Sequence, residues 1–178
     1  MKKISSVMLL LLVVLFAGCG SSQPSVPKVK TSEKFKLEKV SLSIKEKVKS
    51  EIKYHTKDEL EQLLNDMIVE GLTKEGLLST DVTMNTLKIN VIYKRRFVGD
   101  ETPFPSDALG YPFVDYKIDV INDTKILTSM DNTDMTYKGG FAMNLQVIAA
   151  TLRDKKYEVE FIQAVANKIV DDIKKLNE

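Results

Sequence analysis

The chain has 178 residues, of which 43% are hydrophobic, and it carries 26 basic against 25 acidic side chains, a formal charge of +1. This near-neutral balance excludes binding to nucleic acid or to anionic lipid through bulk positive charge. A single cysteine excludes an internal disulfide, and a single histidine leaves carboxylates as almost the only ligands for a metal.

The first segment in chain order has the pattern of an export signal. Lys2 and Lys3 precede an uncharged apolar stretch over residues 7–17, and small residues lead into Cys19. A basic start, an apolar core of about ten residues and a small-residue cleavage site are typical of a secretory signal peptide. The apolar stretch is shorter than the roughly 20 residues that span a membrane. The alternatives are an ordinary signal peptide with an incidental cysteine and an uncleaved anchor.

Residues 15–19, Leu-Phe-Ala-Gly-Cys, resemble the lipobox of bacterial lipoproteins, in which the cysteine receives a diacylglyceryl group and becomes the mature N-terminus. The sequence departs from that motif at Phe16, because the usual leucine lies one place earlier. The resemblance implies that residues 1–18 are a lipoprotein signal peptide and that Cys19 is lipidated, with palmitate and diacylglycerol. Gly20 follows the cysteine, and by family analogy this implies sorting to the outer membrane, with the domain facing the periplasm.

Residues 19–34 are predicted to hold the lipidated cysteine and a flexible linker. Residues 20–34 are polar and contain two prolines, which is typical of a flexible to semi-extended segment. About fifteen such residues have an end-to-end distance of roughly 20–25 Å, enough to hold a domain just off a bilayer. Without Lys2 and Lys3 the mature chain has 24 basic and 25 acidic side chains. Residues 35–178 suffice for a single domain with a real core.

The domain is predicted to begin with a strand and a helix. Residues 35–48 alternate between apolar and polar side chains, as a half-buried strand does. Thr56 lies three residues before Glu59, a capping-box signature, and Gly76 is expected just past the C-terminus of the helix. The apolar stripe of this helix is Leu60, Leu63, Leu64, Met67, Ile68 and Leu72, and the face expected in solvent is Glu61, Gln62, Asn65, Asp66 and Glu70.

Three more strands are predicted in the middle of the chain. Residues 87–98 and 114–120 both alternate with period two. Between them lies a connection over residues 99–110 that contains two prolines. After a turn at Asn122-Asp123, a fourth strand is expected over residues 125–130, with a resumption through Met135 and Tyr137.

The C-terminal part is predicted to end in a helix. Residues 141–153 fit either a short buried helix or a fifth strand, because periodicity alone does not decide between them. Apolar residues then recur at three to four positions over residues 159–176, which predicts an amphipathic helix. The sequence therefore predicts an α+β fold: a mainly antiparallel sheet of four or five strands with two amphipathic helices packed on one face.

This element order, together with the lipobox, resembles a loose group of small outer-membrane lipoproteins that includes the YajG-like lipoproteins and the lipopolysaccharide-assembly lipoprotein LptE. The resemblance covers most of residues 19–178, and its specific part is residues 15–19. It implies an accessory or binding component of the envelope. No functional residue beyond Cys19 is carried over, because many unrelated proteins share an element order.

No catalytic or metal site is predicted. His55, the one histidine, lies just before a helix cap, where solvent exposure or capping explains it. A calcium loop beginning at Asp131 would need glycine and glutamate where Thr136 and Ala142 stand, so residues 131–134 are interpreted as a polar connection or a strand bulge. Asp171-Asp172 is interpreted as part of a solvated helix face. No cofactor is expected.

Two surfaces are candidates for binding. Arg95 and Arg96 lie in a run of aromatic and basic residues on a strand, and they could contact an anionic ligand. The connection 99–110 is long for a compact domain, and such loops tend to be functional. Its candidate partner-binding residues are Phe104, Leu109, Tyr111 and Phe113. If these fold back, the loop is a packed flap; if they are exposed, they form a docking surface.

The leading hypothesis is a non-enzymatic, lipid-anchored accessory or assembly factor that binds another envelope component, most simply a protein, and no nucleic acid. The alternative is a lipoprotein that binds lipid or glycan in the groove between sheet and helices, with Arg95 and Arg96 at its mouth. An envelope hydrolase that uses carboxylates is the least favoured hypothesis.

Overall fold

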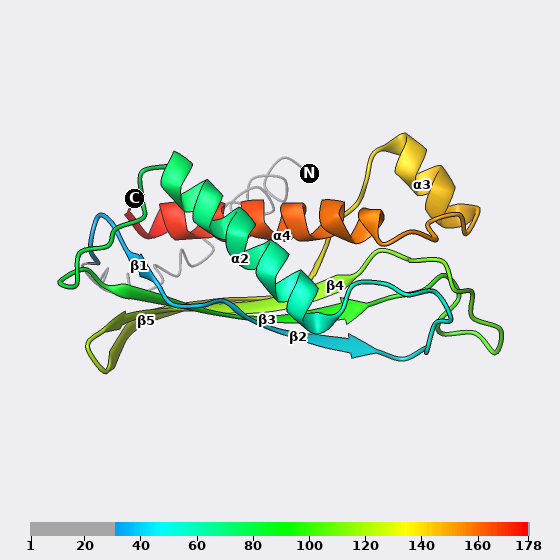
Figure 1. Cartoon of the computed structure of the whole chain (residues 1–178), viewed down its shortest axis with the longest axis horizontal. Helices are drawn as coiled ribbons and strands as arrows, with labels where there is room; N and C mark the ends of the chain where they lie inside the picture. The colour runs from blue at the N-terminus through cyan, green and yellow to red at the C-terminus, as the bar shows by residue number, and fades with distance from the viewer. Residues whose placement is uncertain (1–30, 178) are drawn as a thin grey trace, which may run out of the picture.

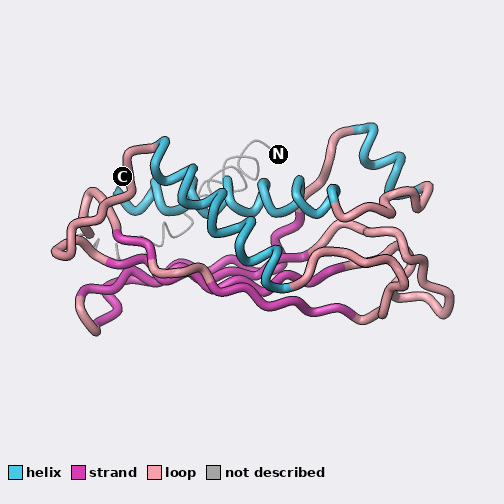
Figure 2. The backbone as a smooth tube through the Cα atoms, viewed as in Figure 1, coloured by secondary structure: helices cyan, strands magenta, loops and turns pink. Residues whose placement is uncertain are grey.

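A computed structural model describes residues 31–177, so the predicted signal peptide, Cys19 and most of the linker lie outside the described residues. The described chain forms two layers, with a sheet below and helices above it (Figure 1). Figure 2 shows the same layers, with the longest loops gathered at the two ends of the molecule. The elements are β1 (Lys36–Leu37), β2 (Ser41–Glu46), α2 (Lys57–Lys74), β3 (Thr86–Arg95), β4 (Phe113–Asn122), β5 (Lys125–Thr136), α3 (Phe141–Ile148), α4 (Lys156–Lys174) and the short 3₁₀ helix η1 (Lys175–Asn177).

The α+β class is confirmed, but two details of the prediction are wrong. Within residues 31–177 the sheet has five strands in a mixed arrangement: β1 and β2 both pair parallel with β3, while β3–β4 and β4–β5 are antiparallel. The parallel pairing follows from α2, because a helix between two strands returns the chain to the starting end of the sheet. The described part also has three α-helices, since the undecided segment forms α3.

The core lies between the sheet and the two long helices. Alternate side chains of β3 and β4 point towards the helices and are buried, whereas their neighbours point to the open face. Helices α2 and α4 pack closely over this layer (Figure 1). A Cβ atom on Gly71 would lie 2.8 Å from Cγ2 of Val170, so the absence of a side chain at Gly71 permits this close approach.

Helix α2 begins and ends as the sequence predicts. Thr56 is the N-cap and forms the capping box with Glu59, and Gly76 follows the C-terminal end with a φ of 69°. The wrong assignment on this helix is Glu61, which was expected in solvent and is only 7% exposed.

The buried Glu61 carboxylate joins α2 to the edge of the sheet. Its Oε2 accepts a hydrogen bond of 3.0 Å from the backbone N–H of Leu42 in β2, and it binds the ammonium groups of Lys57 at 3.0 Å and Lys39 at 2.9 Å. An alternating edge strand leaves half of its N–H groups unpaired, and Glu61 supplies one of the missing acceptors.

The beginning of the described chain is tied to the same end of the sheet as the start of β3. The backbone N–H and the hydroxyl of Ser32 both donate to Oδ1 of Asn85, at 2.9 and 2.8 Å. The Asn85 backbone N–H donates to the Ser32 hydroxyl at 3.0 Å in return. Residue 32 is therefore fixed next to the connection between α2 and β3, at the opposite end of the molecule from α3 (Figure 1).

Strand β5 is longer than predicted. It runs without interruption from Lys125 to Thr136 and follows β4 through two irregularities in the register, the first of them between Val114 and Tyr116. Asp134 takes a positive φ of 52° beside this bulge. The described residues contain no cluster of three or more histidine, cysteine, aspartate or glutamate side chains that could hold a metal ion. Among residues 31–177 no helix is long and apolar enough to cross a membrane.

The Glu61 contacts predict an acid-dependent stability. Hydrogen bonds from Leu42, Lys39 and Lys57 lower the pKa of Glu61 from 4.5 to about 2. Because the folded-state pKa is depressed, the stabilisation is complete above pH 4.5 and is lost as the pH falls from there towards 2. Urea unfolding should show a loss of roughly 2–3 kcal/mol over this range that is absent in Glu61→Gln.

The matched control for this experiment is Glu70→Gln, because Glu70 lies on the same helix and is exposed. That variant should keep the full pH dependence of the wild type. An identical acid profile in the wild type and in Glu61→Gln would show that the contact with β2 contributes nothing to stability.

Candidate functional site

The sequence-predicted binding residues all lie at one end of the molecule, where β2 and β3 end, β4 begins and the connection 99–110 projects (Figure 1). They do not form one surface there. Successive residues of a strand point to opposite faces, so Arg95 points towards the helices while Arg96 points to the open face of the sheet. Both arginines line one pocket at the ends of β2 and β3, but it opens on the exposed face of the sheet rather than between sheet and helices, where the ligand-binding hypothesis had placed them.

Arg95 is buried, with three acceptors around its guanidinium group. Its Nε donates to Oε1 of Glu158 at 2.8 Å, and its Nη1 donates to Oε2 of Glu46 at 2.9 Å. Its Nη2 donates to the backbone carbonyl of His55 at 2.6 Å. The group also lies 5.8 Å from the centre of the Tyr54 ring. These partners account for most of the donors of Arg95, so its role in the described structure is to join β3 to α4 and to the entry of α2.

Glu158 is the centre of this buried cluster and is fully shielded from solvent. Its Oε2 accepts a hydrogen bond from the backbone N–H of His55 at 2.9 Å and lies 3.2 Å from Nδ1 of the same residue. His55 is itself buried and the N-cap is Thr56, so neither solvent exposure nor capping, the two explanations expected for its position, accounts for it. The signal that could have found Glu158 is its helical phase, because it lies three and four residues before the core residues Phe161 and Ile162.

Two tyrosines complete the cluster. Burial and the negative charge of Glu158 raise the pKa of Tyr54 to about 12, and its hydroxyl donates to the backbone carbonyls of Asp107 and Leu152 at 2.6 and 3.2 Å. The Tyr93 hydroxyl is buried and makes no hydrogen bond within the described chain. Burial, followed by Glu158, raises the pKa of Tyr93 well above its ordinary value. Both tyrosines are therefore neutral packing groups at any physiological pH.

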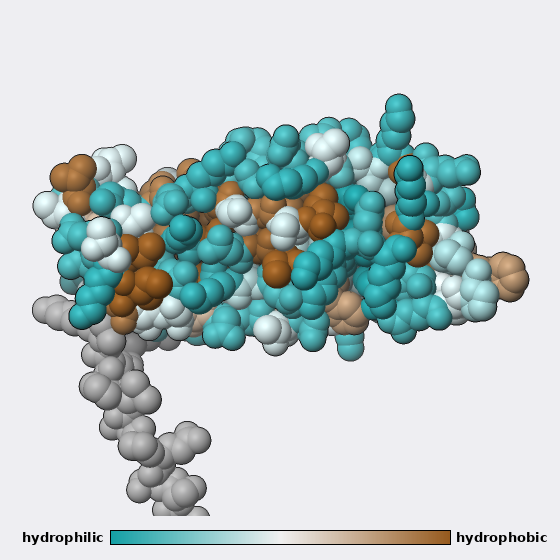
Figure 3. Space-filling model, turned by 90° about the horizontal axis from the view of Figure 1, so that it is seen from below, coloured by the Kyte–Doolittle hydropathy of each residue, from teal (hydrophilic) through white to brown (hydrophobic). Residues whose placement is uncertain are grey.

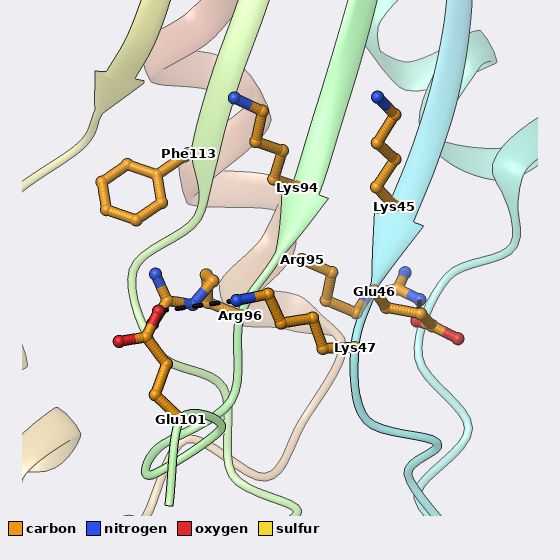
Figure 4. Close-up of a pocket in the computed structure, with 8 residues that line it drawn as sticks. All are labelled: Lys45, Glu46, Lys47, Lys94, Arg95, Arg96, Glu101 and Phe113. Carbon is orange, nitrogen blue, oxygen red and sulfur yellow. Dashed lines mark hydrogen bonds and ion pairs between the residues drawn. The ribbon is translucent and has the colours of Figure 1, made fainter.

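On the open face of the sheet a shallow basic pocket of about 380 Å³ lies over the ends of β2 and β3 (Figure 4). Lys45 pairs in register with Lys94 across β2 and β3, and Lys94 pairs with Phe113 across β3 and β4. Two residues further along the strands, Lys47 and Arg96 form a second row on the same face. With Arg95, Glu46 and Glu101, which also line it, the pocket combines five cations with two carboxylates and one aromatic ring.

Most of these cations already have a carboxylate partner. Lys94 binds Asp115 at 2.8 Å and Asp134 at 2.7 Å, and these two carboxylates raise the pKa of its ammonium group. Lys47 lies 3.6 Å from a carboxylate oxygen of Glu101. Lys45 is different, because it forms no ion pair with any residue of the described part. It is the cation of this pocket that an external anion could bind without displacing an internal partner.

Arg96 closes one side of the pocket. Its guanidinium group binds both carboxylate oxygens of Asp100, with Nη2 to Oδ1 at 2.6 Å, and it lies 5.1 Å from the centre of the Phe113 ring. The bond from Arg96 lowers the pKa of Asp100. A bidentate pair of this kind fixes the beginning of the connection 99–110 to the end of β3.

The connection 99–110 is built as a rigid loop. The backbone N–H of Val98 donates to the carbonyl of Ala108 at 2.9 Å, and that of Ser106 donates to the carbonyl of Val98 at 2.9 Å. Gly99 takes a positive φ of 74°, which favours glycine at this turn. Leu109 is buried and its N–H donates to the carbonyl of Leu152 at 2.8 Å, so the end of the loop is fixed to the chain before α4.

The four apolar residues predicted to bind a partner divide into three environments. Phe104, near the middle of the loop, is 91% exposed, whereas Leu109 belongs to the core. Tyr111 is half-buried against the rings of Tyr137 and Phe161, and its hydroxyl donates to the side chain of Asn144 at 2.6 Å. Phe113 is half-buried below Arg96. The loop is thus a packed flap at its C-terminal end and exposes one aromatic side chain at its tip.

The surface around these features is mostly polar. Viewed from the sheet side, hydrophilic residues cover most of the molecule, with apolar areas at one end and near the middle and an apolar tip at the other end (Figure 3). The large hydrophobic side chains that are at least half exposed in the described part are Val82, Phe104, Ile126, Phe141, Leu145 and Ile148. Three of these six lie on α3, which sequence reasoning had left undecided between helix and strand.

No protein-family model matches the sequence, and no curated protein matches it. Three solved structures resemble the fold distantly. A minor lipoprotein from Acinetobacter baumannii is 18% identical, with a TM-score of 0.40 over 80% of this chain and 94% of that one. A Xanthomonas campestris protein of family DUF330 is 12% identical, with a TM-score of 0.42 over 86% and 90%. Rare lipoprotein B from Shewanella oneidensis is 14% identical, with a TM-score of 0.27 over 75% and 98%. Similarity at this level assigns no family and transfers no functional residue.

The buried cluster predicts a large destabilisation on removal of Glu158. Glu158→Ala leaves the Arg95 guanidinium group and the His55 N–H without their buried acceptor, which should lower the free energy of unfolding by about 3–5 kcal/mol in urea titrations. The exposed neighbour Glu160 provides the control, because Glu160→Ala should change it by no more than about 0.5 kcal/mol.

A double variant of Arg95 and Glu158 distinguishes the effect of an unpaired buried charge from the effect of lost packing. In Arg95→Met with Glu158→Leu both charges are replaced by apolar side chains, so most of the lost stability should return. Equal destabilisation by the single and the double substitutions would mean that packing at these positions, rather than an unpaired buried charge, determines the effect.

Proposed function

We propose that the protein is a lipid-anchored lipoprotein of the bacterial envelope that acts as a non-enzymatic accessory or assembly factor and docks on another envelope protein. The lipobox-like sequence at residues 15–19 supports attachment through Cys19, and Gly20 supports the outer membrane as the location, with the domain in the periplasm. The observation that carries the docking role is Phe104, an aromatic side chain that is 91% exposed on a loop fixed at both ends.

A rigid loop is a favourable way to present such a side chain. Aromatic residues that enter a pocket on a partner contribute much of the binding energy of protein interfaces. A flexible loop loses conformational entropy when it binds, whereas the bonds at Val98, Asp100 and Leu109 have already ordered this one. The lipid anchor would add to this effect, because a partner in the same membrane meets the loop at a raised local concentration.

Photo-crosslinking in cells tests the docking role. A photoreactive amino acid at position 104 should give one dominant adduct with an envelope protein, because the side chain would lie in the interface. The control is the same probe at Val82, which is 81% exposed on the connection between α2 and β3 at the other end of the molecule. Mass spectrometry identifies the adducts. Equal adduct patterns at both positions, or none at position 104, would count against docking through this loop.

The second candidate function, binding of an anionic lipid or glycan, is favoured by one observation. Lys45 forms no ion pair within the described residues and faces a pocket that also holds Lys47, Arg96 and the Phe113 ring. A phosphate or carboxylate could bind to Lys45, and a sugar ring or acyl segment could pack on Phe113. The ligand would then lie on the open face of the sheet rather than between sheet and helices.

The position of Lys45 gives a sharper test of this candidate than the two arginines do, because Arg95 is part of the core. Lys45→Glu should reduce the amount of anionic lipid that copurifies in mild detergent to roughly a tenth, while the exposed Lys125→Glu should leave it unchanged. Quantitative mass spectrometry of the extracted lipids measures both. Equal lipid content in the two variants and the wild type would exclude this pocket as the site.

A further inference from the structure

Helix α3 exposes its largest apolar side chains. Phe141 is 80% exposed, Leu145 50% and Ile148 79%, and their spacing of four and three residues places them on one face of the helix. The opposite face carries Met143, which is buried. No residue of α3 is charged. An amphipathic helix of a soluble domain normally buries its larger apolar side chains, so this orientation calls for a partner.

The contacts on the inner face hold α3 in this orientation. A Cβ atom on Gly139 would lie 2.5 Å from Sδ of Met143, so the methionine packs directly on the backbone that enters the helix. Tyr111 donates to the Asn144 side chain at 2.6 Å and thereby ties the helix to the sheet. Leu152, just after the helix, is fully buried. These contacts orient α3 so that its face with Phe141, Leu145 and Ile148 points outward.

Cations flank this uncharged helix on both sides. Four exposed cations and one acid, Asp154, lie within residues 138–156, in a chain whose charges are otherwise balanced. The Lys155 ammonium group forms only a long ion pair, with Nζ 3.8 Å from Oε1 of Glu59. Arg153 donates through Nε to the backbone carbonyl of Ala150 at 3.3 Å. The four cations are Lys138, Arg153, Lys155 and Lys156.

We propose that α3 is a second membrane contact, an interfacial helix that places Phe141, Leu145 and Ile148 among the headgroups of an anionic bilayer while the flanking cations bind lipid phosphates. Helices of this kind combine an apolar face with lysine and arginine at its border. Each such cation near an anionic surface strengthens binding by roughly fivefold. Lysine is depleted in protein–protein interfaces, so the flanking charges favour lipid over a protein partner.

This inference rests on the membrane attachment in the proposed function. An eight-residue helix alone binds a bilayer weakly, but a lipid anchor on the same chain keeps it at a high effective concentration near the surface. Residues 19–30 could span at most about 40 Å when fully extended. Helix α4 is roughly 28 Å long, and α3 lies just beyond its N-terminal end (Figure 1). The chain between anchor and domain therefore suffices for α3 and the anchor to contact the same bilayer.

The absence of tryptophan from the chain allows a direct test. Ile148→Trp and Val82→Trp each introduce a single fluorophore at an exposed position, the first on α3 and the second at the opposite end. The full-length lipidated protein is reconstituted in vesicles of phosphatidylethanolamine and phosphatidylglycerol with brominated acyl chains. Tryptophan at position 148 should lose roughly half or more of its emission and shift to the blue, because it lies within reach of the bromine atoms. Tryptophan at position 82 should be unchanged.

Replacement of phosphatidylglycerol by phosphatidylcholine should reduce the quenching at position 148, since the flanking cations then lose their anionic partner. Equal, weak quenching at both positions in protein that floats with the vesicles would overturn the α3 contact and leave the anchor intact. Failure to float would overturn both the anchor and this inference. A blue shift at position 148 that depends on protein concentration and persists without bromine would instead assign the face to a second copy of the chain.

Discussion

The arrangement of the end of the molecule that carries the candidate sites depends on one buried carboxylate. Glu158 receives Arg95 from the end of β3 and the backbone of His55 from the entry of α2, so a single side chain of α4 fixes three elements to one another. A buried charge of this kind costs solvation free energy and holds only with well-placed partners. In return, Glu158 fixes the relative positions of the elements that it joins. The 99–110 loop, the basic pocket and α3 are all attached to these elements.

The elements could be predicted from the sequence because their signals are local. The capping box at Thr56, the positive φ at Gly76 and the period-two strands are each set by neighbours in the chain. The parallel pairing of β2 with β3 follows from the order strand, helix, strand, which was itself predicted, so the error lay in assembling the elements into a sheet and not in recognising them. The segment 141–153 resisted prediction for a different reason: its apolar residues face both the core and solvent, so no single periodicity stands out.

The candidate site could be predicted only in part. The connection 99–110 was singled out by its length, but the sequence could not show that Phe104 is exposed while Leu109 fills the core, since both are apolar and five residues apart. The buried acids Glu61 and Asp172 were wrongly assigned to solvent and Glu158 was overlooked, because a carboxylate is expected outside unless its partners are known. Those partners, Leu42 and Arg95, come from other elements. A buried charge whose partners come from distant elements is therefore the feature that is hardest to recognise from the sequence.

The bonds between Ser32 and Asn85 fix the beginning of the described chain at one extremity of the domain. With the proposed attachment through Cys19, the anchor would hold this extremity and α3 would hold the other. The 99–110 loop lies at the same extremity as α3, so the proposed contact of α3 with the bilayer would present this loop close to the membrane surface. A domain supported at both extremities would search for a partner in the plane of the membrane, without unfolding or changing shape.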